Sequence, residues 1–318
     1  MKPCAAVDIG SNSVLLLIAR AGDDGLEPLL ERFAVTRLSE GVAATGTISP
    51  AAIRRTEAAL ADYARLIARY RAERVHCVGT QVFRQAANAR QVIRAWQARF
   101  GWPVRVLTGR EEARYTYLGA LGSLTPAQRQ QAVAVADIGG ASTEVAIGRG
   151  TALSRLESLP LGGVVLKEQF RCGEQLDLAV QGKIREAVRR QLARSHIGER
   201  PDLLLAVGGT ATTLAAVALG LQTYRFQALD GYRFTGTALA ALFQQLNALS
   251  LEDRRALPGM EPGRADIILP ATLILLELMR HFGLPELIVS ARGVRFGILM
   301  ADPDCAPGTI QEEKDDSA

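Results

Sequence analysis

Two stretches of the chain place a carboxylate, glycines and hydroxyls at the same spacing. They read VDIGSNS (residues 7–13) and ADIGGASTE (residues 136–144), and each follows an apolar run. Two copies of one pattern in a chain predict a duplicated fold. Laid over each other without a gap, the stretches pair Asp8 with Asp137, Ile9 with Ile138, Gly10 with Gly139 and Ser13 with Ser142.

Turns of this composition are suited to binding phosphate. Glycines let the backbone approach a ligand closely, and successive N–H groups in a tight turn form a concave anion-binding surface. The alternative is a hairpin with a polar tip, and the duplication favours the functional interpretation over it. The predicted phosphate-binding residues are Gly10, Ser11, Asn12 and Ser13 in the first copy and Gly139, Gly140, Ala141, Ser142 and Thr143 in the second.

Carboxylates next to these turns predict a metal site. Asp8 and Asp137 each stand just before a turn, where an oxygen ligand can hold Mg²⁺ or a metal-bound water. Glu144 occupies the position at which the first copy has Leu15. A carboxylate in only one copy indicates a task, which we take to be metal or water binding beside Asp137. The expected cofactor is Mg²⁺, and the candidate ligands are Asp8, Asp137 and Glu144.

The elements that must position these residues follow from hydrophobic patterning. Each turn reads as strand, tight turn, strand, and Ser49 with Pro50 marks a helix start. Strands that alternate with helices predict a largely parallel sheet flanked by helices. An apolar helix is expected over 263–283, kinked or interrupted at Pro270. The polar stretch 122–131 is the expected bridge between domains.

A third glycine turn lies in LLLAVGGTATTLAA, residues 203–216. A buried strand delivers Gly208 and Gly209 to a turn, and Thr210 is expected to cap the helix that follows. Helix N-termini offer N–H groups to anions, so Gly208, Gly209 and Thr210 are further candidates for binding phosphate. The open alternative is an ordinary strand-to-helix turn that needs glycine for clearance.

Composition narrows the classes of protein. The net charge is modestly positive and carried almost entirely by arginine, which suits a polyanionic ligand. No apolar run approaches the length of a membrane span, and no charged leader precedes Asp8, so we expect a cytoplasmic protein with no membrane partner. Basic residues are not interleaved with aromatics, so nucleic acid is not an expected partner. Without C-x-x-C spacing, the cysteines are expected to be reduced, in neither a disulfide framework nor a zinc site: Cys4, Cys77, Cys172 and Cys305.

Several ordered motifs together resemble one family. VDIGSNS and DIGGASTE are similar to its two phosphate loops, and TGREEARYTYLGAL (108–121) and VGTQVFRQAANA (78–89) to its Glu-containing segment and Arg-containing loop. RADIILPA (264–271) and VSARGVRFGIL (289–299) are similar to its closing signature. The chain thus resembles, from Val7 to about Leu299, the exopolyphosphatase/guanosine pentaphosphate phosphohydrolase family of the actin-like ATPase superfamily.

The resemblance implies an α/β fold of two actin-like (ribonuclease H-like) domains with an interdomain cleft. Their expected bounds are 1–121 and 122–302, with the C-terminal helix 293–302 as a candidate to pack on the first domain. A disordered acidic tail is expected over 303–318. The extra C-terminal helical domains of longer members are missing, which implies a short, two-domain form. A homodimer is implied by the resemblance alone.

The implied activity is Mg²⁺-dependent hydrolysis of the terminal phosphoanhydride bonds of inorganic polyphosphate, with guanosine pentaphosphate (pppGpp) as a further substrate. Glu112 matches the family's catalytic glutamate, which orients or deprotonates water, and Arg84 its phosphate-contacting arginine. Glu111 points in another direction from Glu112, because adjacent helix positions do. Asp137 and Glu144 complete the expected catalytic set. The alternatives to these functional roles are a solvated acid at a helix start for Glu112 and an ordinary surface residue for Arg84.

Two other functions remain open at this point. An actin-fold ATPase or kinase would need an adenosine pocket, which residues 208–210 could supply. A catalytically weak polyphosphate or nucleotide sensor would bind with little turnover. Ala141 keeps the sensor open, because it replaces a glycine of the family's DIGGGSTE loop and limits the φ values of the turn.

Overall fold

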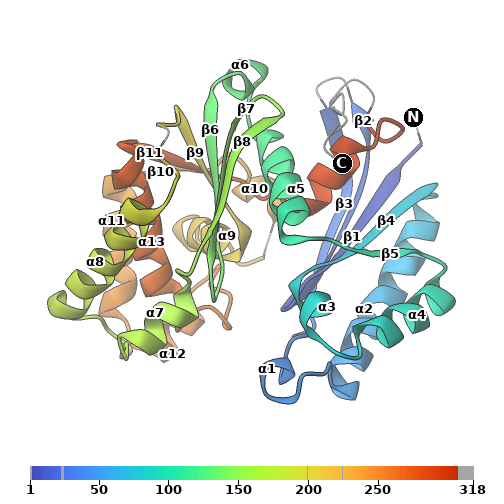
Figure 1. Ribbon diagram of the computed structural model, residues 1–318, viewed down its shortest axis with the longest axis horizontal. Helices are drawn as coiled ribbons and strands as arrows, with labels where there is room; N and C mark the ends of the chain where they lie inside the picture. The colour runs from blue at the N-terminus through green and yellow to red at the C-terminus, as the bar shows by residue number, and fades with distance from the viewer. Residues whose placement is uncertain (1, 23–24, 199, 224, 307–318) are drawn as a thin grey trace. The chain divides into compact units, whose positions relative to one another are not determined.

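The computed structural model describes residues 2–22, 25–198, 200–223 and 225–306. The chain divides into two compact units, each with one sheet (Figure 1). The first unit runs to Gly122 and resumes at Val294, and the second spans Ser123–Gly293. The first unit is therefore built from both ends of the chain. In the described part of the chain, no helix has the length and apolar character to span a bilayer.

The first unit contains a five-stranded sheet in the order β3-β2-β1-β4-β5. Antiparallel pairs join β1 to β2 and β2 to β3, and parallel pairs join β1 to β4 and β4 to β5. The strands are β1 (Cys4–Ile9), β2 (Ser13–Gly22), β3 (Gly25–Val35), β4 (Arg74–Gly79) and β5 (Val104–Val106).

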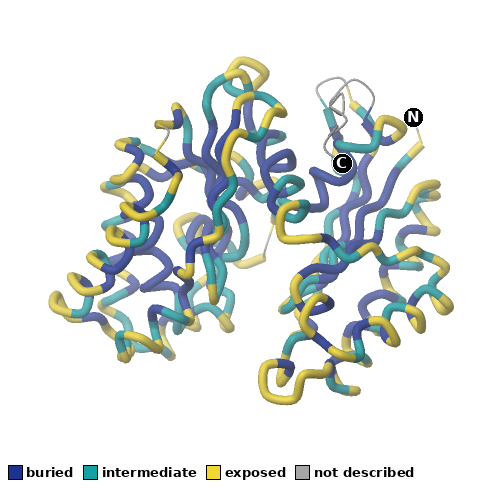
Figure 2. Tube along the Cα trace, viewed as in Figure 1, coloured by how far each residue is buried: buried dark blue, intermediate teal, exposed yellow. Residues whose placement is uncertain are grey.

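Helices cover both faces of this sheet. Alternate residues of β1 face opposite sides, so Ala5 and Val7 pack with α2 and α4 whereas Cys4 and Ala6 pack with α14. Figure 2 shows these strands as buried and the outer faces of the helices as exposed. The helices are α1 (Val42–Thr45), α2 (Pro50–Arg69), α3 (Gln81–Gln85), α4 (Ala89–Phe100), α5 (Gly109–Leu121) and α14 (Val294–Ala301).

Local sequence explains where three of these helices lie. Helix α2 begins as predicted at Ser49, whose hydroxyl accepts the N–H of Ala52 at 3.2 Å, with Pro50 in the first turn. Helices α5 and α14 pack backbone to backbone at Gly297, because a Cβ there would overlap the carbonyl of Tyr115.

The second unit contains a six-stranded sheet in the order β10-β11-β9-β6-β7-β8. Its strands are β6 (Ala132–Ile138), β7 (Thr143–Arg149), β8 (Ala152–Leu159), β9 (Leu203–Val207), β10 (Arg233–Thr235) and β11 (Glu286–Val289). Its helices are α6 (Pro126–Arg129), α7 (Gly163–Gln169), α8 (Leu178–Arg194), α9 (Gly208–Ala218), α10 (Phe226–Leu229), α11 (Gly236–Ala248), α12 (Leu251–Ala256) and α13 (Ile268–Phe282). One apolar core joins the sheet to α8, α9, α11 and α13.

The two sheets repeat one plan, which confirms the predicted duplication. In each, a strand of the repeated motif pairs antiparallel with the next strand and parallel with one that follows a helix. The second and third strands of each copy share an irregularity at the same place, between Ile18 and Ala19 in one and between Ile147 and Gly148 in the other. The prediction of a largely parallel sheet is wrong, because each copy opens with an antiparallel meander that alternation of strands and helices does not reveal.

Three other expectations need correction. Helix α13 begins at Ile268 and not at Gly263, so Pro270 lies in its first turn, where no backbone N–H is needed, and it does not kink the helix. The cysteines are not all reduced, because Cys4 and Cys305 form a disulfide. Residues 303–306 also depart from the expected disordered tail, since Cys305 and Ala306 are buried. The rest of that tail, 307–318, lies outside the described residues.

A buried ion pair joins α13 to α8 in the second unit. The Glu277 side chain is 1% exposed, and its oxygens accept hydrogen bonds from Arg185 at 2.8 Å and from Arg189 at 2.6 and 3.1 Å. Burial raises the pKa of Glu277, but the hydrogen bonds from both arginines outweigh burial and hold the pKa below its ordinary value of 4.5.

Glu277→Gln is therefore expected to destabilise the second unit by about 2–3 kcal/mol near neutral pH, because the negative charge that pairs with both arginines is lost. A lowered folded-state pKa stabilises above the unfolded-state pKa, and this contribution disappears as the pH falls through the folded-state value. The gap between wild type and variant should thus narrow in acid, as measured by urea unfolding. Glu186→Gln on α8 removes an exposed pair with Arg190 and is the control, with no measurable change expected. If the difference in unfolding free energy between wild type and Glu277→Gln stayed constant down to acid pH, the lowered pKa of Glu277 would be contradicted.

Candidate phosphate-binding site

The two repeated turns have the same hydrogen bond. The N–H of Gly10 donates to the carbonyl of Ser13 at 3.0 Å, and that of Gly139 to the carbonyl of Ser142 at 2.9 Å. A Cβ on either glycine would lie 3.1 Å from the same carbonyl oxygen, so both positions favour glycine. These two N–H groups close the turns and do not face a ligand, which corrects the prediction that Gly10 and Gly139 offer theirs to phosphate.

The remaining turn N–H groups point outward. The carbonyls of Gly139 and Gly140 accept from Gly163 at 3.0 Å and Val164 at 2.9 Å, at the start of α7. A trans peptide directs its N–H opposite to its C=O, so the N–H groups of Gly140 and Ala141 point away from α7. Within the described residues, neither donates to a protein acceptor. Two adjacent N–H groups aimed outward are the arrangement that binds an anion.

The first turn is supported in a similar way. The carbonyl of Ser11 accepts the N–H of Ser39 at 2.9 Å, and that of Asn12 accepts the N–H groups of Thr36 and Arg37 at 3.0 and 2.8 Å. The N–H groups of Ser11 and Asn12 donate to no protein acceptor in the described part of the chain. Each unit therefore presents one turn with two N–H groups that, within the described residues, donate to no protein acceptor.

Ala141 fits its turn without strain. Among the described residues, the only ones other than glycine with positive φ are Arg37, Arg71 and Arg171. Alanine at this position is exposed and adopts a φ that a methyl group tolerates. The replacement of glycine therefore leaves the turn geometry intact.

Asp137 and Glu144 lie on one face of the second sheet. They are directly opposite each other in the antiparallel β6–β7 pair, so their side chains project to the same side. In the first sheet the same register pairs Asp8 with Leu15. Glu144 Oε1 accepts hydrogen bonds from the hydroxyls of Ser142 at 2.7 Å and Ser158 at 2.8 Å. Ser142 therefore directs its proton to Glu144.

The third glycine turn lies beside Asp137. Gly208 has φ +77°, and a Cβ there would overlap Oδ1 of Asp137. Gly208 is the first residue of α9, so the Asp137 carboxylate lies at a helix N-terminus, where negative charge is stabilised. A Cβ on Gly209 would overlap the guanidinium of Arg264. The turn thus brings a carboxylate and an arginine together.

Two predicted hydroxyl ligands are used inside the fold. The Thr143 hydroxyl donates to the carbonyl of Leu161 at 2.6 Å, and the Thr210 hydroxyl to the carbonyl of Ile138 at 2.8 Å. Both threonines are buried, at 0% and 1% exposure. Neither hydroxyl is placed to bind phosphate. Thr210 is also not the helix cap, because α9 begins at Gly208 after Val207.

In the first unit the structure brings Arg84 and Glu112 together. Arg84 Nη1 donates to Glu112 Oε2 at 3.0 Å and to the carbonyl of Leu107 at 2.5 Å. Arg84 lies on α3 and Glu112 in the first turn of α5, and each side chain is 32% exposed. The pair is therefore accessible to a ligand and fixed by the backbone at Leu107.

Glu111 has a different task from Glu112. Its carboxylate accepts the N–H of Thr108 at 2.8 Å and the hydroxyl of Thr108 at 2.9 Å, which forms a capping box at the start of α5. The hydrogen bond from the Thr108 N–H is the main cause that holds the pKa of Glu111 below its ordinary value. This division of roles supports Glu112 as the acid that faces substrate.

The carboxylates of the second unit are chemically suited to Mg²⁺. Asp137 and Glu144 supply hard oxygen donors from neighbouring strands, and Mg²⁺ is commonly held by one or two protein carboxylates. Asp8, at the end of β1, supplies the equivalent donor in the first unit. Burial raises the pKa of the Cys77 thiol on neighbouring β4 to about 12, and the negative charge of Asp8 is the second cause of this rise.

Sequence reasoning did not single out Arg264 or Ser158. Arg264 stands over Gly209 and pairs with Glu261 at 2.6 Å. It begins the RADIILPA motif, which is the only signal that could have found it. Ser158 has no sequence signal, since its contact with Glu144 depends on the pairing of β7 with β8.

Comparison with known proteins gives consistent matches over nearly the whole chain. The sequence model of the Ppx/GppA phosphatase family matches residues 17–304. Exopolyphosphatase 2 of Mycobacterium tuberculosis is 34% identical over 314 residues, which cover 93% of this chain and 97% of that protein. A structure of the Ppx/GppA enzyme of Aquifex aeolicus is 33% identical, has a TM-score of 0.85 and covers 95% of this chain and 99% of its own. A second structure of that organism's family member has a TM-score of 0.83 at 33% identity, over 94% of this chain and 96% of its own.

Proposed function

The chain belongs to the Ppx/GppA phosphatase family, and we propose that it removes terminal phosphates from inorganic polyphosphate in a Mg²⁺-dependent reaction. It is a phosphoanhydride hydrolase with the two-domain actin-like fold of its structural relatives. The observation that carries the proposal is the repeated turn, which in each unit presents two N–H groups that donate to no protein acceptor among the described residues. The predicted cleft stays a prediction, as do the homodimer and the cytoplasmic location.

In the proposed reaction, the chain's own groups bind and orient. The N–H groups of Ser11, Asn12, Gly140 and Ala141 bind phosphate oxygens, and Arg84 neutralises the charge that develops on the transferred phosphoryl. Glu112 accepts a proton from the attacking water. The water oxygen bonds to the terminal phosphorus, the bridging P–O bond breaks, and the shortened polyphosphate leaves as an oxyanion. Arg84 also holds the Glu112 carboxylate in position.

Asp137 and Glu144 are the residues that would hold Mg²⁺, with Asp8 as a further candidate. The ion would neutralise phosphate charge when bound. Ser142 and Ser158 fix the orientation of the Glu144 carboxylate through their hydroxyls. Gly208 leaves room for Asp137.

The test is orthophosphate release with Mg²⁺ from long polyphosphate, short polyphosphate, pppGpp and ATP. We expect release from polyphosphate, and release from pppGpp would add the second substrate of the proposal. Turnover of ATP alone, or transfer of phosphate to an acceptor, would favour an actin-fold ATPase or kinase. Binding of polyphosphate without release would favour a sensor and overturn the hydrolase proposal.

A further inference from the structure

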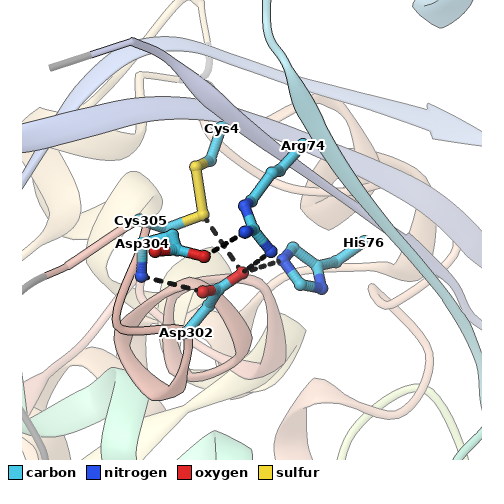
Figure 3. Close-up of a disulfide and its surroundings, with 6 residues drawn as sticks. All are labelled: Cys4, Arg74, His76, Asp302, Asp304 and Cys305. Atoms are coloured by element: carbon cyan, nitrogen blue, oxygen red, sulfur yellow. Dashed lines mark hydrogen bonds and ion pairs between the residues drawn. A yellow bond between two sulfur atoms is a disulfide. The ribbon is translucent and has the colours of Figure 1, made fainter.

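Four side chains of metal-binding type meet in the first unit (Figure 3), and none of them is among the residues proposed for phosphate chemistry. Cys4 begins β1, His76 lies on β4, Asp302 follows α14, and Cys305 is bonded to Cys4. His76 Nε2 is 2.8 Å from Asp302 Oδ2, and Cys305 Sγ is 3.5 Å from the same oxygen. The donor atoms of His76, Asp302 and Cys305 all lie within 4.8 Å of one another.

The fold brings these residues together from distant parts of the sequence. In the parallel β1–β4 pair, Cys4 is opposite Arg74 and Ala6 is opposite His76. Side chains two residues apart share a face, so Cys4 and His76 project to the same side of the sheet. Helix α14 packs on that side through Phe296, Leu299 and Met300, and places the turn that carries Asp302 and Cys305 beside them.

We propose that, when the disulfide is reduced, Cys4, Cys305, His76 and Asp302 bind one Zn²⁺ ion. Two thiolates, an imidazole and a carboxylate are a tetrahedral donor set for zinc. Zinc bonds of about 2.0 Å place the nitrogen and oxygen ligands about 3.3 Å apart, close to the His76–Asp302 separation. The sulfur atoms need only separate to about 3.8 Å, which side-chain rotation supplies once the disulfide is open.

Charge and burial support the same assignment. Two thiolates and one carboxylate around Zn²⁺ leave one net negative charge. Arg74 lies beside it, with Nη1 at 3.6 Å from Asp302 Oδ2 and an ion pair with Asp304. Cys4 and Cys305 are 3% and 1% exposed, whereas the His76 side chain is 31% exposed, so the thiols are shielded and an ion can enter past His76.

The carboxylate is also oriented for a metal. Asp302 Oδ1 accepts the N–H of Asp304 at 2.9 Å, which directs Oδ2 toward His76 and Cys305. A hydrogen bond to the outer oxygen of a ligand is the support that metal sites require. In the disulfide form the same Asp302 oxygen contacts His76, Cys305 and Arg74.

Conversion of the disulfide form into the zinc-bound form balances in electrons and protons. A dithiol reductant gives two electrons and two protons to the Cys4–Cys305 bond, becomes a disulfide itself, and leaves two thiols. Binding of Zn²⁺ then releases both thiol protons to solvent. The disulfide and the zinc site are therefore alternatives, and either one ties the end of α14 to β1.

Cobalt binding tests the site directly. The full chain is reduced with a phosphine, freed of reductant without oxygen, and titrated with Co²⁺. We expect one equivalent to bind with the absorption bands of tetrahedral cobalt and of sulfur-to-cobalt charge transfer, and Zn²⁺ to displace it. The oxidised protein should give neither band. His76→Ala and Cys305→Ser should weaken binding by more than about 100-fold, the upper end for losing a mere supporting residue.

Matched controls exist in the same chain. Cys172→Ser and His196→Ala remove a thiol and an imidazole that lie elsewhere, and both variants should bind as wild type does. Octahedral or non-stoichiometric cobalt, or tetrahedral cobalt retained in Cys305→Ser, would overturn the proposal.

A second measurement needs no variant. In the reduced wild-type protein, Zn²⁺ should protect Cys4 and Cys305 from alkylation, as read by peptide mass, while Cys172 reacts at an unchanged rate. Because both thiols are buried, the reaction is run long enough for the reduced, zinc-free protein to be alkylated at Cys4 and Cys305. An equal alkylation rate in the presence of Zn²⁺ would then contradict the site. The outcome is independent of phosphatase activity, because none of the four ligands belongs to the proposed phosphate site.

Discussion

Glu112→Gln is expected to lower kcat for orthophosphate release by about 10²–10⁴-fold while polyphosphate affinity changes little. A general base contributes about this factor, and glutamine cannot accept the proton of water. The amide oxygen can still accept the hydrogen bond of Arg84 Nη1, so the local structure should persist. The measurement is steady-state phosphate release together with direct polyphosphate binding.

Glu111→Gln is the matched control on the adjacent residue. Glu111 receives the N–H and the hydroxyl of Thr108 within the capping box, so its change should cost stability, about 1 kcal/mol or less, and leave kcat near wild type. If Glu112→Gln keeps wild-type turnover, or if both variants lose activity equally, Glu112 is not the base.

Gly208→Ala is expected to reduce activity by at least about 100-fold and to raise the Mg²⁺ concentration needed for half-maximal rate. A methyl group would overlap Asp137 Oδ1 and displace the carboxylate. A shift of about 1 Å in a catalytic group can cost a factor of this size. The positive φ of +77° adds a backbone cost of about 1–2 kcal/mol to folding.

Gly220→Ala separates these two effects. Gly220 follows α9 with φ +60° and has open space where a Cβ would stand, so alanine pays a similar backbone cost without a clash. We expect both variants to lose stability in thermal unfolding, Gly208→Ala at least as much as Gly220→Ala because of its added overlap with Asp137, whereas only Gly208→Ala loses phosphate release and Mg²⁺ response. Equal rates of phosphate release in Gly208→Ala and Gly220→Ala would show that Asp137 has no role in the reaction.

The repeated motif predicted much of the fold because its pattern is local. Alternation and glycine spacing lie within a few residues, so the strand–turn–strand units at Gly10 and Gly139 follow from sequence. The mixed sheets do not follow, because strand direction is decided by pairing between distant segments. The start of α13 was misjudged because apolar residues from Gly263 onward fit a helix as well as they fit the turn that precedes it.

The sequence predicts single residues of the candidate site but not the contacts between them. Motif resemblance proposed Arg84 and Glu112 separately, and only the fold shows that they share a hydrogen bond. The hydroxyls of Thr143 and Thr210 looked like ligands, because sequence does not tell which side chain satisfies a buried carbonyl. The Cys4–Cys305 bond does not follow from the sequence for another reason: its partners stand 301 residues apart, and only the fold brings them together.

The way the first unit uses both ends of the chain has a consequence for biosynthesis. A ribosome delivers all of Ser123–Gly293 as one continuous segment, so the second unit can fold while synthesis continues. The face of β1 that α14 covers must wait for residues 294–306 to emerge. The segment made first is thus completed last, and Cys4 stays exposed to the solvent and chaperones of the nascent chain until then.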